Sequence, residues 1–307
     1  NSAATAPVSP NSKGTLPTGK IGKHTFSRLI SGGNLLSGWC HQRDLLFVRN
    51  LATAYLTETK QFDTLQMLEE LGVNSIIIDL IQLDIVKKYR QQRGGKMQTI
   101  VSVREGWGDW SNPHWEDFKT QIQRTAEKGP DIMYIHGGYA DRLVQTGKPQ
   151  NIELLSKGIE FIREQGFSAG LGAHALEVLK ESDRIGLKPD YYVKTFHHDR
   201  YWSATPKERR KPFCVDGPHS LDHNEFHDNI FCTDAEGTAE YMLDKTVPWI
   251  AFKVLAAGAI SPRSGFKYAF ENGADFIAVG MFDFEVNEDV QAVKQVLSDC
   301  QRERPWC

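Results

Sequence analysis

Two related stretches decide the fold class, Asp190-Tyr-Tyr-Val-Lys-Thr-Phe-His-His-Asp199 and, later in the chain, Pro248-Trp-Ile-Ala-Phe-Lys-Val-Leu-Ala-Ala-Gly258. Each has the composition of a short buried strand that carries a lysine, and the first ends in two histidines and an aspartate. A lysine inside an apolar strand is costly unless it has a partner or a role. Two such strands in succession therefore indicate a functional site at the strand ends.

The same alternation of strand and helix repeats along the chain. Apolar strands are predicted at 28–34, 73–79, 98–103, 131–136, 168–174, 191–196, 249–255 and 275–279, with amphipathic helices between them. Eight strand–helix units in about this length predict an α/β fold, a (β/α)8 TIM barrel, with an irregular insertion at about 198–233 after strand six. A doubly wound open sheet is the alternative, but Gly32-Gly33 is too short to be its glycine-rich fingerprint.

The bulk composition is that of a soluble globular protein. The 307 residues are 40% hydrophobic and 24% charged, with a net charge of −3, which excludes a typical nucleic-acid binder. No apolar run is long enough to span a bilayer. We expect a flexible leader at 1–26 and a single barrel domain at 27–307, and the sequence leaves a homo-oligomer open.

The polar leader and the cysteines bear on the compartment. A leader of this composition is what remains when a signal peptide is removed, so we expect export to the periplasm or outside the cell, with a cytoplasmic location left open. The five cysteines include two pairs that bracket short segments, Cys214 with Cys232 and Cys300 with Cys307. Both pairs could form disulfides and leave Cys40 free, or all five could be reduced.

Polar residues follow the predicted strands at the end where a barrel carries its active site. Side-chain alternation predicts that Lys194 faces the interior while Val193 and Thr195 face the helices. In the next strand, Lys253 is expected to face inward and Ile250 and Phe252 outward. The predicted mouth holds Asn34, Asp79, Arg104, His136, His174, Lys194, His198 and Lys253.

Three histidines from neighbouring strands suit either of two chemistries. His136, His174 and His198, with Asp283 or Asp79, could bind zinc, manganese, iron or nickel. The same imidazoles could instead act as general acid and base without a metal. No nucleotide cofactor is expected. The residues predicted to be catalytic are Lys194, Lys253, His198 and Asp79, and those predicted to bind substrate are Asn34, Arg104, Glu105, Trp107, Trp202, Gly258 and Gly280.

Two segments carry a family resemblance. Val193-Lys-Thr195, followed by Ala251-Phe-Lys-Val-Leu-Ala-Ala-Gly-Ala-Ile260, resembles strands six and seven of the deoxyribose-phosphate aldolase group of class I aldolases. The resemblance implies a TIM barrel in which Lys194 forms a Schiff base and Lys253 assists. The segments at 256–260 and 273–281 are also similar to the last two strand ends of phosphate-binding barrels, where the backbone N–H groups of Gly258 and Gly280 would hold an anion.

These observations together predict an enzyme that acts on a small carbohydrate or keto compound. Metal-assisted or His/Lys acid–base chemistry would support an isomerase, epimerase, lyase or hydrolase. Exposed aromatic side chains near the mouth, such as Trp107 and Trp202, suit stacking on sugar rings. Two alternatives remain, a Schiff-base aldolase that uses Lys194 and a non-catalytic sugar-binding barrel. Paired carboxylates for ordinary glycoside hydrolysis are not evident.

Overall fold

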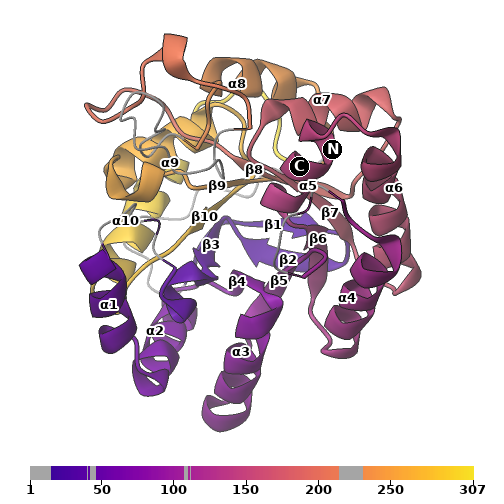
Figure 1. Cartoon of the computed structure of the whole chain (residues 1–307). Coiled ribbons are helices and arrows are strands. Elements are labelled where there is room, and N and C mark those ends of the chain that lie inside the picture. The colour runs from indigo at the N-terminus through magenta and orange to yellow at the C-terminus, as the bar shows by residue number, and fades with distance from the viewer. Residues whose placement is uncertain (1–14, 40, 42–45, 107–109, 111, 214–230) are drawn as a thin grey trace.

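A closed barrel of eight parallel strands forms the centre of the molecule (Figure 1). The computed structural model describes residues 15–39, 41, 46–106, 110, 112–213 and 231–307. Neighbouring strands follow the order β10-β3-β4-β5-β6-β7-β8-β9, so the last strand pairs with the first. The fold confirms the predicted (β/α)8 barrel. The strands are β3 (Leu29–Gly32), β4 (Ser75–Asp79), β5 (Gln98–Val103), β6 (Ile132–Ile135), β7 (Ala169–Ala173), β8 (Tyr191–Thr195), β9 (Trp249–Phe252) and β10 (Phe276–Val279).

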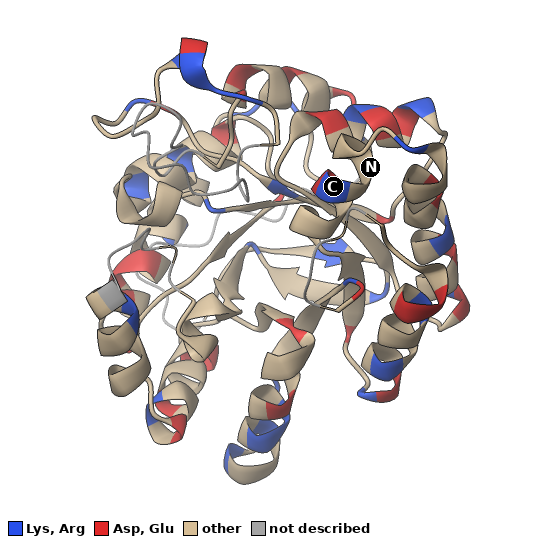
Figure 2. Cartoon of the chain, in the orientation of Figure 1, with Lys and Arg blue, Asp and Glu red and all other residues tan. Residues whose placement is uncertain are grey.

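Helices surround the barrel on the outside (Figure 1). They are α1 (Leu46–Tyr55), α2 (Glu58–Glu70), α3 (Leu80–Arg93), α4 (Trp115–Glu127), α5 (Gly137–Gln145), α6 (Pro149–Glu164), α7 (Leu176–Arg184), α8 (Ala235–Leu243), α9 (Pro262–Glu271) and α10 (Asp283–Asp299). Short 3-10 helices lie at η1 (Gly33–Ser37), η2 (Lys207–Arg209) and η4 (Ala256–Gly258). Acidic and basic residues alternate on the outer helices in Figure 2, which is expected for a solvent-facing surface near neutral charge.

Apolar side chains fill two layers. Inside the barrel, one cluster is built from Ile30, Ile100, Ile132, Tyr134, Tyr191, Val193, Ile250 and Phe276. Outside it, the alternate strand residues pack against the helices, among them Leu29, Ile76, Val101, Met133, Leu171, Tyr192, Trp249 and Ile277. Since successive residues of a strand point to opposite faces, these two clusters show directly which residues can reach the barrel axis.

A β-hairpin closes the end of the barrel at which the parallel strands begin. Strands β1 (Thr18–Ile21) and β2 (His24–Ser27) pair antiparallel, and the side chains of Ile21 and Phe26 are fully buried in the interior cluster. The prediction of a flexible leader is therefore wrong for residues 18–26. The segment is polar in composition, but two of its apolar side chains, Ile21 and Phe26, enter the barrel. Residues 1–14 lie outside the described part of the chain.

A buried carboxylate fixes the C-terminal segment at the end of the barrel where the strands begin. Asp275 is fully buried and accepts hydrogen bonds from Arg304 Nη1 at 2.6 Å and from the backbone N–H of Trp249 at 3.0 Å. Arg28, at the start of the barrel, donates to the carbonyl oxygen of Asp275 at 2.9 Å and lies 4.3 Å from the ring centroid of Trp306. The first and last parts of the barrel are thus joined by charge-assisted hydrogen bonds.

The described residues contain no disulfide, which bears on the two alternatives for the cysteines. Cys232, Cys300 and Cys307 are free thiols, so neither Cys300 with Cys307 nor Cys232 with any partner is bonded. Cys40 and Cys214 lie outside the described residues. Cys232 instead packs between strand β8 and helix α8, where its Sγ is 3.9 Å from Thr238 Oγ1.

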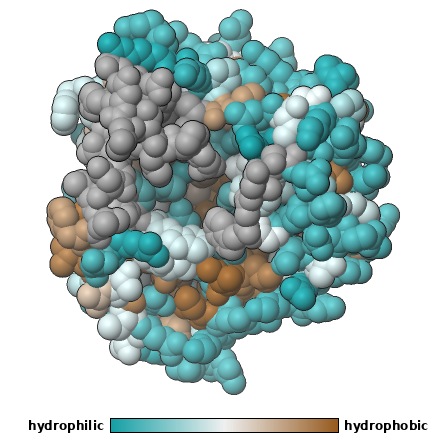
Figure 3. Space-filling model, in the orientation of Figure 1, coloured by the Kyte–Doolittle hydropathy of each residue, from teal (hydrophilic) through white to brown (hydrophobic). Residues whose placement is uncertain are grey.

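Two features of the surface concern partners. Within the described residues, the helices are all too short or too polar to cross a membrane. Phe47 and Leu51 on α1 are 61% and 65% exposed. Figure 3 shows hydrophobic surface at the left edge of the molecule, the side on which Figure 1 labels α1. An exposed apolar helix face is a place to look for a partner. The homo-oligomer stays a prediction.

Replacing the side chain that seals the barrel should test the hairpin. We expect Phe26→Ala to lower the free energy of unfolding by about 3–5 kcal/mol, because it leaves a cavity among interior side chains. The measurement is urea unfolding followed by circular dichroism. Thr25→Ala, on the exposed face of the same strand, is the control and should change stability by less than about 0.5 kcal/mol. Equal effects of the two substitutions would show that the hairpin does not seal the barrel.

Candidate active site

The carboxyl ends of strands β4 to β7 bring four polar side chains to the mouth of the barrel. Asp79, Arg104, His136 and His174 each lie two residues beyond a position that faces the barrel axis (Ile77, Ser102, Tyr134 and Gly172), and alternation turns all four inward as predicted. Gly172 allows the close approach of β6 and β7, because a Cβ there would lie 2.4 Å from the carbonyl oxygen of Ile135. Their roles in chemistry remain predictions.

Asp79 and Arg104 form a buried ion pair at the mouth. Nη1 of Arg104 contacts Oδ2 of Asp79, and the Ser102 hydroxyl donates to the same oxygen at 3.3 Å. Asp79 also caps helix α3 through its side chain, while Gln82 Oε1 accepts from its backbone N–H at 2.7 Å. The pair places a fixed guanidinium beside the mouth without adding net charge.

His174 is held by a carboxylate from helix α5. Its Nδ1 lies 2.7 Å from Asp141 Oδ2, and Asp141 also accepts from the backbone N–H groups of His174 and Ala175 at 3.1 Å. An ionised carboxylate can only accept, so Nδ1 carries a proton, and in the neutral imidazole the lone pair is on Nε2. The His174 ring centroid is 5.3 Å from that of Phe252, an interior residue of β9, which places the imidazole at the mouth.

His136 has the opposite tautomer. Its Nδ1 accepts a hydrogen bond from the backbone N–H of Tyr139 at the start of α5, so its proton is on Nε2. Burial lowers the pKa of His136 well below its usual value, and the charges of Arg104 and Lys253 lower it further. Below about pH 6.5, His136 therefore takes up a proton more readily in the unfolded chain than in the folded one, so acidification lowers the free energy of unfolding.

Lys253 reaches the mouth through an unusual backbone conformation. It follows Phe252, which faces the interior, so plain alternation would send it outward. Its φ of 58° lies in the left-handed region, as do those of Ala256 and Ala257, which is costly for non-glycine residues and is often found at functional sites. The ammonium is 3.0 Å from His41 Nε2 and 4.4 Å from the ring centroid of Phe231.

His41 completes this side of the mouth. Its Nε2 lies 3.0 Å from the Lys253 ammonium and 3.3 Å from the Asn34 amide nitrogen, two donors, so this nitrogen carries no proton. The ammonium of Lys253 lowers the pKa of His41 well below its usual value, with burial and His174 adding to the effect. His41 and His136 are therefore both neutral imidazoles at physiological pH.

Two residues predicted for the mouth lie elsewhere. Val193 belongs to the interior cluster and Tyr192 to the outer one, so Lys194 faces the helices, contrary to the prediction. It is 1% exposed, and its ammonium donates to the carbonyl and hydroxyl oxygens of Thr195 at 2.9 and 3.0 Å. The outward orientation predicted for Ile250 and Phe252 is also wrong, because Ile250 belongs to the interior cluster and Phe252 packs against it. His198 lies against α9, with Nε2 2.9 Å from the Ser264 hydroxyl.

The predicted metal ligands do not converge. His198 is bonded to Ser264, and Asp283 accepts from Lys60 Nζ at 2.7 Å and from the Tyr55 hydroxyl at 2.6 Å on the outer helices. Across the described ranges, no three His, Cys, Asp or Glu side chains are grouped so that they could hold a metal ion. The predicted ligands therefore do not form a metal site in this arrangement, and metal binding stays a prediction.

The predicted substrate-binding residues are dispersed. Asn34 and Arg104 are at the mouth. Glu105 accepts from the His114 backbone N–H at 3.2 Å, and burial raises the pKa of its carboxyl. Trp202 is 98% exposed. The N–H of Gly258 donates to the carbonyl oxygen of Leu255 at 3.0 Å and is not available to an anion, while Gly280 is exposed beside Leu35. Trp107 lies outside the described residues.

Three residues of the mouth were missed from the sequence. Asp141 lies five positions after His136, between the predicted strand at 131–136 and the next predicted helix. His41 lies in a polar loop, and Phe231 in the insertion, where no periodic pattern marks either one. Only the spacing His136-Gly-Gly-Tyr-Ala-Asp141 carried a signal, because one helical turn beyond a strand end places a carboxylate near the neighbouring strand.

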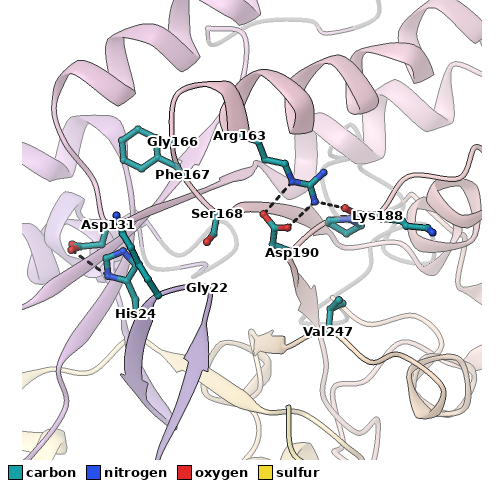
Figure 4. A pocket seen from close by; sticks show the side chains of 12 residues that line it. Gly22, His24, Asp131, Arg163, Gly166, Phe167, Ser168, Lys188, Asp190 and Val247 are labelled. Atoms are coloured by element: carbon teal, nitrogen blue, oxygen red, sulfur yellow. Dashed lines mark hydrogen bonds and ion pairs between the residues drawn. The ribbon is translucent and has the colours of Figure 1, made fainter.

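A separate cleft of about 810 Å³ lies at the opposite end of the barrel. It is bordered by the β1–β2 turn and by residues that precede strands β6 to β9 (Figure 4). Arg163 and Asp190 form an ion pair there at 2.7 Å, and His24 Nδ1 is 3.9 Å from Asp131 Oδ1. The charged side chains of the cleft are thus paired with one another. The active sites of such barrels lie at the carboxyl ends of the strands, which is the other end of this barrel.

The comparisons with known proteins establish the fold alone. No family model matches the sequence, and no curated protein matches it. A provisionally assigned aldo-keto reductase from Pseudomonas aeruginosa is 15% identical over 94% of this chain and 98% of that chain, with a TM-score of 0.58. A mutant of Gox0644 in complex with NADPH is 10% identical over 95% and 97%, with a TM-score of 0.53.

One further solved barrel is named as an aldolase. A provisionally assigned deoxyribose-phosphate aldolase from Coccidioides immitis is 11% identical over 93% of this chain and 92% of that chain. Its TM-score is 0.43, which carries no argument for a shared reaction. The chain is a TIM barrel, and no one family is assigned.

The charge of Lys253 should be visible in the titration of His41. We expect Lys253→Met to raise the pKa of His41 toward 6.5, since the ammonium is the largest cause of its depression. The measurement is a pH titration of the histidine Cε1–H signals by NMR. Lys207→Met, which removes an exposed cation from η2, is the control. An unchanged His41 titration in Lys253→Met would show that the two groups are not in contact.

Proposed function

We propose that this protein is an enzyme that moves a proton at the carbon next to the carbonyl group of a small sugar or keto compound. One observation carries the proposal: two histidines from adjacent strand ends have opposite tautomers, His174 with a free lone pair on Nε2 and His136 with a proton on Nε2. One can accept a proton while the other donates a hydrogen bond, which is the division of labour that such a reaction needs.

His174 suits the role of base. When Nε2 takes the proton from carbon, the imidazole becomes positively charged, and Asp141 at 2.7 Å from Nδ1 stabilises that charge. The same carboxylate fixes the ring through its contact with the His174 backbone. The base is therefore oriented before substrate binds, which lowers the cost of reaching the transition state.

His136 and Lys253 suit the stabilisation of the oxyanion. A neutral imidazole N–H can polarise a carbonyl without giving up its proton, and the low pKa of His136 keeps it neutral. The Lys253 ammonium supplies a positive charge on the same side of the mouth, since it lowers the pKa of both His136 and His41. As the carbon loses its proton, negative charge moves to the carbonyl oxygen and meets these donors.

The walls of the mouth favour a polar substrate with apolar faces. The Arg104–Asp79 pair and the Asn34 amide offer hydrogen bonds to hydroxyl groups. The rings of Phe231 and Phe252 flank the ammonium at 4.4 and 5.9 Å and offer apolar surface to sugar C–H groups. Return of the proton to the former carbonyl carbon, with transfer of the hydroxyl proton from one oxygen to the other, gives an isomerase. Protonation of the original carbon on its other face by a second acid, such as water, gives an epimerase.

The Schiff-base alternative at Lys194 has less support. Its ammonium donates to Thr195 and lies 3.9 Å from Cys232 Sγ, between strand β8 and helix α8. A carbonyl substrate at the mouth would have to cross the strand to reach it. Lys253 is the lysine at the mouth, and its ammonium lies 4.4 and 5.9 Å from the ring centroids of Phe231 and Phe252.

Solvent deuterium incorporation tests the proposal directly. We expect the protein in D2O to incorporate deuterium next to the carbonyl of at least one aldose, ketose or keto acid in a panel followed by NMR. His174→Asn and Lys253→Met should each lower the rate by about 100-fold or more, because they remove the base and the oxyanion donor. Asp141→Asn should also lower it, since the amide disturbs the tautomer of His174.

A matched histidine variant makes the test specific. His24→Asn changes a histidine at the opposite end of the barrel and should leave the rate unchanged. Two outcomes would contradict the proposal: oxidation of NADPH by the same carbonyl compounds with no deuterium incorporation, or incorporation that survives His174→Asn.

Borohydride reduction separates the two lysines. We expect reduction in the presence of a reactive aldehyde or ketone to leave Lys194 unmodified, because its side chain is 1% exposed and fully hydrogen-bonded. The modified lysines are identified by peptide mass spectrometry, and exposed Lys207 serves as an internal control for non-specific reaction. A stoichiometric adduct at Lys194 would support the aldolase alternative.

A further inference from the structure

The chain returns from the insertion at Phe231 and Cys232, which are fixed to the end of strand β8. His197 Nε2 accepts hydrogen bonds from both of their backbone N–H groups, at 3.1 Å from Phe231 and 3.0 Å from Cys232. The Thr195 hydroxyl lies 2.9 Å from the Phe231 carbonyl oxygen and 3.0 Å from that of His174. Both polar groups of the Phe231 backbone are thus held by side chains of the strand end.

His197 can do this only as a neutral imidazole of one tautomer. Its Nδ1 lies 2.9 Å from the His198 carbonyl oxygen, which requires the proton on Nδ1 and leaves the Nε2 lone pair for the two amides. The side chain is fully buried, and burial lowers its pKa to about 4. Among the described residues, the charged or titratable groups that face it are Lys194, His198, Arg210 and Tyr201. Arg210 is paired with Asp199 at 2.9 Å, and the Tyr201 ring centroid is 6.0 Å from that of His197.

The residue that is held in this way contacts the candidate catalytic lysine. The ring of Phe231 lies 4.4 Å from Lys253 Nζ and 5.3 Å from the ring centroid of His41. An ammonium on a flexible four-carbon stem loses much conformational freedom when it is fixed. An aromatic face in a set position favours one placement of the ammonium by cation–π attraction and keeps water from that side.

We propose that His197 is a positioning residue, which holds the Phe231 backbone so that the aromatic ring covers the ammonium of Lys253. The effect on turnover rests on the proposed function, whereas the structural effect does not. His197 touches neither the mouth nor the ammonium itself. Its influence passes through the Phe231 and Cys232 amides to the ring and from the ring to Lys253.

Two substitutions at position 197 and one at position 231 separate the steps. His197→Gln keeps an oxygen acceptor near the position of Nε2 and cannot be protonated, whereas His197→Leu removes the acceptor. Phe231→Leu removes the ring and leaves the backbone contacts in place. The readouts are the hydrogen exchange rates of the Phe231 and Cys232 amides and the pKa of His41, which reports where the Lys253 ammonium lies. Neither readout requires a substrate.

In His197→Leu we expect both amides to exchange about tenfold faster or more, and the pKa of His41 to rise toward 6.5. His197→Gln should change neither. Phe231→Leu should raise the pKa of His41 while both amides stay protected. Normal amide protection in His197→Leu would overturn the proposal, as would faster exchange with an unchanged His41 titration.

Acidification gives a test that does not depend on His197→Leu being folded. The wild-type amides should lose protection as pH falls through about 4, because protonation of His197 removes their acceptor, while His197→Gln should retain protection there. Loss at the same pH in both proteins would overturn the proposal. If a substrate shows deuterium exchange, His197→Leu should lower kcat about 10- to 100-fold and His197→Gln should restore it. Failure of deuterium exchange in every protein would count against the proposed function and leave the amide and His41 results in force.

Discussion

The alternation of side chains along eight closed parallel strands is the constraint on which the mouth depends. Only every second residue of a strand can face the axis, so each strand end offers one inward position, and the rest must come from the loops above. Strands β4 to β7 use this position for Asp79, Arg104, His136 and His174. Strand β8 uses it for Thr195, which excludes its lysine from the interior. Lys253 follows an inward-facing residue of β9, and its left-handed backbone conformation turns its side chain to the mouth.

The electrostatic arrangement of the mouth follows from this placement. Two cations, Arg104 and Lys253, lie near imidazoles that remain neutral because those cations and burial lower their pKa. Arg104 is paired with Asp79, and the Lys253 ammonium lies 3.0 Å from Nε2 of His41. Asp141 has another role at His174, since its carboxylate lies 2.7 Å from Nδ1 and fixes the orientation of the ring. Neighbouring histidines are thus prepared for different tasks by different partners.

The sequence predicts the barrel well because its helices and strands have distinct periods and clear turn signals. It also predicts the inward side of β4 to β7, since each strand ends in or is followed by a polar residue whose direction follows from the alternation of side chains along the strand. It fails on β8 and β9, which are apolar on both faces, so the pattern does not show which side faces the axis. The neighbours of Lys194 on the adjoining strands are Ala173 and Ala251, whose small side chains leave room for a lysine on the helix side.

The other misses have a common physical origin. His41, Asp141 and Phe231 come from loops or from a helix, and their positions depend on contacts between segments far apart in the chain. The hydrogen bond between Lys253 and His41 spans 212 positions, and that between His197 and Phe231 spans 34. The hairpin at 18–27 was missed because a polar composition resembles disorder, although two buried side chains are enough to fix it in the barrel.

The pairing of β10 with β3 has a consequence for how the chain acquires its structure. Leu29 meets Ile277 in this pair, and the Arg28 contact with Asp275 joins residues 247 positions apart. Such distant contacts form slowly, because a long loop must close before they are made. During synthesis the growing sheet therefore keeps two open edges, β3 and the newest strand, and open edges invite pairing with other chains. Folding of this protein is most exposed to aggregation in the interval before its last strand arrives.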